Sequence, residues 1–152
     1  MWRIFGICFY GDKNHFLIER EKRFSQDLIV PFLREKRIAM SDTAAEVVRT
    51  KNTASDKDLE IVEQTDLDAL LRALPLCEAV ITAGQLATSV FCRHFQIAEP
   101  RVGDFSGLSF EGCEVRLYRM PSSSRAYPMT VERKAQVYRK VFVWLGMVGL
   151  ER

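Results

Sequence analysis

The segment Tyr118–Pro128, with the sequence YRMPSSSRAYP, carries the side chains of this chain that are best suited to chemistry. Its centre is three consecutive serines, Ser122 to Ser124, which a proline precedes and Arg125 follows. Serine hydroxyls and consecutive backbone amides can donate hydrogen bonds to phosphate oxygens, and an arginine adds positive charge. The prolines restrict the backbone and so lower the entropy that the loop loses on ordering. The segment therefore indicates either a binding site for a ligand that carries phosphates or an ordinary polar surface loop.

Three other segments contain residues that could line a site beside this loop. In ITAG, Gly84 allows a tight turn between an apolar run and a helical pattern, which the fold alone could require. In MSD, Asp42 is followed by Thr43, and either a helix N-cap or a catalytic carboxylate fits this pair. The stretch 49–60 contains basic residues and is typical of a solvated loop or of a surface that contacts a polyanion.

The cysteines and histidines are placed in a way that argues against a metal centre. The four cysteines form no CxxC pair, and the chain has only two histidines, His15 and His94. The cysteines are Cys8, Cys77, Cys92 and Cys113. This pattern is typical of reduced, mostly buried thiols in a cytoplasmic protein, and we expect neither a metal nor another cofactor.

The length and composition suit a single globular domain, 1–152. Hydrophobic residues make up 47% of the 152 residues and charged residues 28%, which allows a core without disulfide bonds. Because the net charge is only +2, a surface for nucleic acid would have to come from local clusters of basic residues. No apolar run approaches the roughly 20 residues that span a bilayer, so we expect no membrane partner.

The elements that must position these residues follow from the hydrophobic periodicity. Helical spacing predicts helices over 1–9 (with Trp2, Phe5 and Phe9 on one stripe), about 24–36, 65–74 (capped by Thr65), 84–95 and 130–145 (capped by Thr130). Apolar runs predict buried strands at 37–42 and 78–84, and a hairpin over 108–120 that turns at Glu111–Gly112. This order predicts an α/β fold, a three-layer α/β/α domain with a short parallel sheet. Because ligands of such folds bind beyond the carboxyl ends of the strands, the ends MSD, TAG and MPSSS should meet.

Several of these segments together resemble the uracil-DNA glycosylase superfamily, in particular its hypoxanthine-type and mismatch-type branches. The matching segments occur in the same order as in the family and together cover nearly all of the chain. The segments are MWRIFG at 1–6, REKRIAMSDTAAEVVRTKNTASDKDLE at 34–60, TDLDALLRALPLCEAVITAGQLATSVF at 65–91 and LYRMPSSSRAYPMTVERKAQVYRKVF at 117–142. The resemblance implies an enzyme that flips a deaminated base, uracil or hypoxanthine, out of damaged or mismatched DNA and hydrolyses its glycosidic bond.

The resemblance also implies roles for individual residues. Asp42 would border the base pocket as the catalytic carboxylate. The other residues that would line the pocket are Ser41, Thr43 and Gly84. The DNA-binding residues would be Arg49, Lys51, Asn52, Met120, Pro121, Ser122, Ser123, Ser124, Arg125 and Tyr127. The serines would hold phosphates, and the segment 125–127 would lie where the family inserts a wedge into the gap left by the flipped base.

The chain departs from the family pattern at its N-terminus. Family members have a further strand with a catalytic motif before the position of Met1, and that strand is central in their sheet. We therefore expect a truncated start, with a monomer for the full-length protein and a possible dimer for the truncated chain.

Three alternatives come from other classes of protein. The first is a DNA-binding remnant of the family without activity. The second is a serine hydrolase or phosphate-binding enzyme, which would need a base beside its serine, although neither His15 nor His94 lies at a predicted strand end. The third is an interaction domain with a purely structural role.

Overall fold

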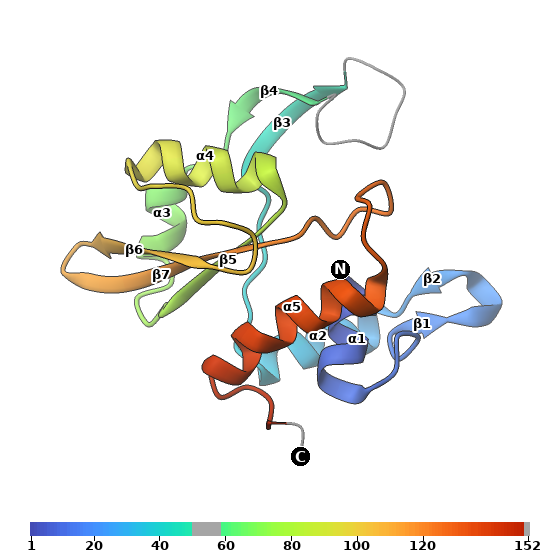
Figure 1. The fold of residues 1–152 in the computed structure, drawn as a ribbon. Helices are drawn as coiled ribbons and strands as arrows, with labels where there is room; N and C mark the ends of the chain where they lie inside the picture. The colour runs from blue at the N-terminus through green and yellow to red at the C-terminus, as the bar shows by residue number, and fades with distance from the viewer. Residues whose placement is uncertain (50–58, 151–152) are drawn as a thin grey trace. The chain divides into compact units, whose positions relative to one another are not determined.

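A computed structural model describes residues 1–49 and 59–150 of the chain (Figure 1). The chain divides into two compact units. The terminal unit comprises Met1–Ser41 and Met129–Arg152, and the central unit comprises Asp42–Pro128. Both units contain helices and strands, so the predicted α/β class is confirmed, whereas the single-domain organisation stays a prediction.

The terminal unit is built from helices and a small antiparallel hairpin. Its elements are α1 (Trp2–Tyr10), β1 (Leu17–Ile18), the 3-10 turn η1 (Glu19–Glu21), β2 (Arg23–Phe24), α2 (Gln26–Glu35) and α5 (Val131–Trp144). Helix α2 starts at Ser25, whose hydroxyl accepts a 3.3 Å hydrogen bond from the Leu28 amide. Helix α5 starts at Thr130, as predicted, because its hydroxyl accepts from the Arg133 amide at 3.3 Å. Local capping therefore fixes both starts.

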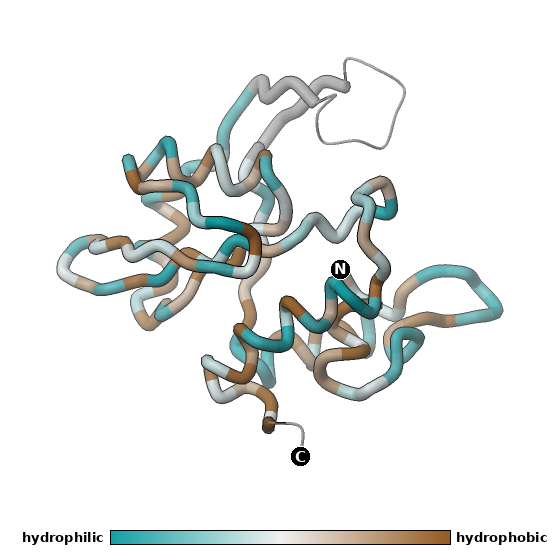
Figure 2. Tube along the Cα trace, viewed as in Figure 1, coloured by the Kyte–Doolittle hydropathy of each residue, from teal (hydrophilic) through white to brown (hydrophobic). Residues whose placement is uncertain are grey.

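Aromatic rings form the core of the terminal unit. Figure 2 shows that hydrophobic and hydrophilic residues alternate along α5, which is the pattern of a helix with one buried face. On that face Phe142 lies with its ring centroid 5.6 Å from Phe5 and 4.8 Å from Phe9. Phe32 of α2 contacts the same two rings. The predicted stripe of α1 is thus confirmed in its packing, since Trp2 also contacts Phe5 edge-on at 5.8 Å.

The central unit contains two separate sheets. The strands of the first, β3 (Ala44–Arg49) and β4 (Leu59–Gln64), are antiparallel. The second has the strand order β5 (Ala79–Ala83), β7 (Cys113–Met120) and β6 (Phe105–Phe110), with β5 parallel and β6 antiparallel to β7. Helices α3 (Leu67–Arg72) and α4 (Gln85–Phe95) lie before and after β5 in the chain. Their buried side chains form one apolar core with the sheet, made of Leu67, Leu71, Phe91, Cys92, Leu108, Val115 and Leu117.

The strand predicted at 37–42 is wrong. The chain turns at Arg37, which has a φ of 54°, and residues 38–42 have no regular structure. The strand forms instead in the segment that follows, where β3 pairs with β4. These two strands lie at the two ends of the stretch 49–60, which was predicted as a loop. The rest of that stretch, residues 50–58, lies outside the described residues.

Two further details of the sheet and the helices differ from the prediction. The three-stranded sheet is mixed rather than parallel, because the predicted hairpin is present and places β6 antiparallel to β7. That hairpin turns at Glu111 and Gly112, both with positive φ, as predicted. The N-cap of α3 is Asp66, whose carboxylate accepts from the Ala69 amide at 2.9 Å. Thr65 instead donates its hydroxyl proton to the Asp42 carbonyl oxygen at 2.6 Å.

The cysteines are free thiols, as predicted. Cys8 and Cys92 are buried, Cys77 is half-buried and Cys113 is exposed. Burial raises the pKa of the Cys8 thiol to about 12, so this side chain stays protonated and unreactive near neutral pH. Within the described part of the chain, no helix combines the length and the apolar character needed to cross a bilayer.

The aromatic core predicts a test of stability in the terminal unit. Phe142→Ala should lower the free energy of unfolding by about 3–5 kcal/mol, because it removes a buried ring and leaves a cavity. Trp144→Ala on the same helix should cost far less, since Trp144 is 58% exposed. Urea unfolding followed by circular dichroism measures both changes. Equal losses for the two variants would contradict the placement of α5.

Candidate functional site

The carboxyl ends of β5 and β7 meet in the central unit. The two strands are parallel, and their last residues, Ala83 and Met120, are register partners. One residue further on, the Gly84 amide donates a 3.0 Å hydrogen bond to the Met120 carbonyl oxygen. The structure therefore places two of the three predicted strand ends, TAG and MPSSS, side by side, and the loop after β7 begins next to the first turn of α4.

Gly84 is required at this junction for two physical reasons. Its φ of 95° and ψ of 174° belong to a region that residues with a side chain rarely adopt. In addition, a Cβ built on Gly84 would lie 3.1 Å from the Cβ of Ser122. The glycine thus allows the backbone after β7 to approach α4 closely. The sequence predicted a tight turn here, and the contact with Ser122 is the specific reason for it.

The serines of the loop shape its backbone. The Ser122 hydroxyl accepts a 3.2 Å hydrogen bond from the Ser124 amide, and the Ser124 hydroxyl accepts one of the same length from the Ala126 amide. The Tyr127 amide donates to the Ser124 carbonyl oxygen at 3.2 Å. These bonds hold the loop in successive turns. A hydroxyl that accepts in this way still carries a proton of its own, which it can donate.

Burial separates the residues of the loop into two groups. Met120, Pro121 and Ser122 are buried, so they belong to the core of the unit rather than to its surface. Ser123, Ser124 and Tyr127 are half-buried, and Arg125 is exposed. Of the residues predicted to contact DNA from this loop, the second group is therefore the one whose side chains can reach a ligand directly.

A polar network that the sequence analysis missed lies at the first turn of α4. The Arg119 guanidinium donates to the Gln85 side-chain oxygen and, at 3.1 Å, to the Pro100 carbonyl oxygen. The Gln85 amide group donates to Glu99 and Ser89, each at 2.8 Å. Hydrogen bonds from the Ser89 and Gln85 side chains lower the pKa of the Glu99 carboxyl. Arg119, whose charge could serve a ligand, is thus a structural residue that ties β7 to α4.

Asp42, the predicted catalytic residue, does not follow a strand of the three-stranded sheet. Its carbonyl oxygen accepts from Thr65, and the Thr43 carbonyl oxygen accepts from the Thr65 amide at 3.3 Å. Asp42 and Thr43 therefore lie at the base of the β3–β4 hairpin. Ser41 is the last residue of the first segment of the terminal unit.

The remaining predicted DNA contacts fall at the edge of the described structure. Arg49 is the last residue of β3. Lys51 and Asn52 lie outside the described residues. The structure thus brings together Gly84 and the loop from Met120 to Ser124.

The glycine contact predicts a measurable coupling. Gly84→Ala should lower the free energy of unfolding by about 1–3 kcal/mol from backbone strain, with a further loss from the contact with Ser122. Replacing Ser122 by glycine in that variant should recover the steric part of the loss. Urea unfolding of the single and double variants measures this coupling.

A matched control is Gly112→Ala, at a φ of 83° with nothing within 4 Å of the added methyl group. Its loss should be smaller and should not change when Ser122 is replaced. If both glycines coupled to Ser122 equally, the close approach at Gly84 would be wrong.

The chemistry that this arrangement supports is the binding of an anion. The loop offers backbone amides, hydroxyl protons and the exposed Arg125, and the described residues contain no group of three or more His, Cys, Asp or Glu side chains that could hold a metal ion. His94 pairs with Asp68. Comparisons with protein-family models, with curated proteins and with solved structures find no match.

Proposed function

We propose that the chain binds DNA phosphates through the loop Pro121–Tyr127 and excises a deaminated base, uracil or hypoxanthine, in the manner of the uracil-DNA glycosylases. The observation that carries the proposal is the junction of the parallel strands β5 and β7, where Gly84 allows the serine loop to approach α4. A ligand site beyond the carboxyl ends of parallel strands is the general position for α/β folds. The three-layer arrangement of that family is part of the same proposal.

The order within the loop supports phosphate binding. Its turns are held by hydrogen bonds from the Ser124 and Ala126 amides, and Pro121 is buried. A loop that is already ordered loses little entropy when it closes on a ligand. The exposed guanidinium of Arg125 can form paired hydrogen bonds with a phosphate.

The proposed reaction is hydrolysis of the N-glycosidic bond. The target base is first flipped out of the helix, at a cost of a few kcal/mol that is lowest for a mispaired base. Water then adds to the sugar carbon C1′ while the bond from C1′ to the base nitrogen breaks and its electron pair leaves with the base. The water gives up one proton, and the departing base takes up one. In this proposal the Asp42 carboxylate receives the proton of the water, and Thr43 and Gly84 border the base.

The binding part of the proposal predicts a dependence on salt. With two to four phosphates contacted, the logarithm of the DNA association constant should fall by about 2–4 units per tenfold increase in salt. Arg125→Ala should reduce this slope by about 1, because one phosphate contact is lost. Fluorescence anisotropy with a labelled duplex that contains one uracil measures the slope.

Arg101→Ala is the matched control, since Arg101 is also an exposed arginine of the central unit. It should leave the slope unchanged. If the chain did not bind DNA at low salt, or if Arg125→Ala and Arg101→Ala changed the salt slope equally, the proposal that the loop contacts DNA would be rejected.

The catalytic part predicts the release of a base. Incubation with duplexes that contain uracil or hypoxanthine should produce alkali-labile abasic sites. Asp42→Asn should slow their formation by about 10²–10⁴-fold, as for the loss of a general base, without weakening binding. Glu114→Gln, another exposed acid of the central unit, should have no effect. Tight binding without base release by the unaltered chain would reject the glycosylase while retaining the DNA-binding protein.

A further inference from the structure

Charge is distributed unevenly between the two units. The terminal unit contains thirteen lysines and arginines against seven aspartates and glutamates, whereas the central unit contains nine against thirteen. The small net charge of the chain, +2, hides this difference. A polyanion is attracted to local clusters of positive charge rather than to the average. The surface with the strongest attraction for nucleic acid is therefore expected on the terminal unit, away from the serine loop in the sequence.

The terminal unit also presents an aromatic ring to solvent. Tyr10, the last residue of α1, is 44% exposed and stacks on His15 with 3.6 Å between the ring centroids and an angle of 7° between the planes. The ring also contacts Phe16 at 5.7 Å and Phe32 at 6.0 Å. These contacts hold Tyr10 in place, so the exposed part of its ring is a rigid apolar surface.

Cations border the same group of rings. The Lys36 ammonium lies 5.8 Å from the centroid of Phe9, whose ring is 5.0 Å from Phe32. Arg37 follows Lys36 in the chain and is exposed. Basic residues at the end of α2 also stabilise the helix dipole, which alone could explain their position. The dipole does not explain why the exposed Tyr10 packs on Phe32, the ring that contacts Phe9.

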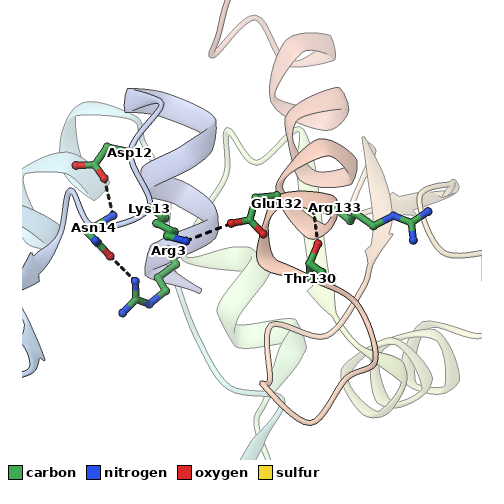
Figure 3. A network of polar contacts seen from close by, with 7 residues as sticks. All are labelled: Arg3, Asp12, Lys13, Asn14, Thr130, Glu132 and Arg133. Carbon is green, nitrogen blue, oxygen red and sulfur yellow. Dashed lines mark hydrogen bonds and ion pairs between the residues drawn. The ribbon is translucent and has the colours of Figure 1, made fainter.

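Lys13 adds a third cation, in the loop between Tyr10 and His15. Figure 3 shows that its ammonium reaches Glu132 of α5, at 3.4 Å. Both side chains of this pair are more than half exposed. Exposed ion pairs contribute little free energy, so a phosphate can replace the carboxylate at low cost. Arg3, in the same figure, is engaged differently, because it donates to the neutral side chain of Asn14.

We propose that this surface, defined by Tyr10, Lys13, His15, Lys36 and Arg37 and called the Tyr10 surface, binds single-stranded DNA. Proteins that bind single strands combine aromatic rings, on which bases stack, with cations that follow the phosphates. In a duplex the base faces are covered by their neighbours, so only an unpaired segment can use Tyr10. The proposal rests on the terminal unit alone and does not require the serine loop or base excision.

The test uses the full chain and a fluorescently labelled thymidine oligomer at low salt. Tyr10→Ala should weaken binding by about 5- to 100-fold, the range for the loss of one stacked base. Tyr10→Phe, which keeps the ring, should bind like the unaltered chain. The matched control is Phe105→Ala in the acidic central unit, because Phe105 is also 44% exposed. It should leave the affinity unchanged.

Two further measurements separate stacking from charge. An oligomer of abasic sugar phosphates should bind the unaltered chain and Tyr10→Ala equally, since it has no base to stack. Arg37→Gln should weaken binding to both oligomers and lower the salt slope by about 0.7, the value for a phosphate contact in a single strand. Circular dichroism shows whether each variant is folded. If Tyr10→Ala fails to fold, Arg37→Gln still tests the Tyr10 surface.

The outcomes also distinguish this proposal from the serine loop. Equal losses for Tyr10→Ala and Phe105→Ala, or tighter binding to a duplex than to the single strand, would overturn it. If Arg125→Ala alone weakened binding to the thymidine oligomer, the single strand would lie on the serine loop and the Tyr10 surface would be rejected. Equal affinity for a ribonucleotide oligomer would support binding by stacking of bases on Tyr10, without recognition of the sugar.

Discussion

The parallel pairing of β5 with β7 is the constraint on which the geometry of the central unit depends. Parallel strands end at the same edge, and the register that pairs Ala83 with Met120 brings Gly84 and Pro121 to one place. A slip of one residue would turn the buried Val115 and Leu117 toward the face that now holds the exposed Glu114 and Arg116. The apolar core therefore fixes the register, and the register fixes the junction where the serine loop begins.

The same junction shows how a polar loop can be structural and still able to bind a ligand. Ser122 and Ser124 accept hydrogen bonds from amides further along the loop, and these bonds determine its turns. The composition of the segment could not separate a phosphate grip from a surface loop, and the structure explains why. Both need backbone turns held by hydroxyl groups, so the distinction depends on the half-buried Ser123 and the exposed Arg125 rather than on the number of serines.

The sequence predicted best the features that local chemistry decides. The cap at Thr130, the aromatic stripe of α1 and the turn at Glu111–Gly112 each depend on residues close together in the chain. The strand predicted at 37–42 failed because a short apolar run carries no information about a partner strand. The bonds of Gln85 with Arg119 could not be foreseen either, because they depend on the register of strands more than thirty residues apart.

The separation of charge sets a physical condition on any function that involves DNA. An acidic unit repels a polyanion, and salt at physiological strength limits that repulsion to about 8 Å, the Debye length. Within this distance a few contacts from the serine loop can orient a phosphate, but long-range attraction adds little to their affinity. The terminal unit has the opposite balance, with Lys13 and Arg37 exposed and the ammonium of the half-buried Lys36 over the ring of Phe9. Affinity for nucleic acid and chemistry upon it therefore need not come from the same unit of this chain.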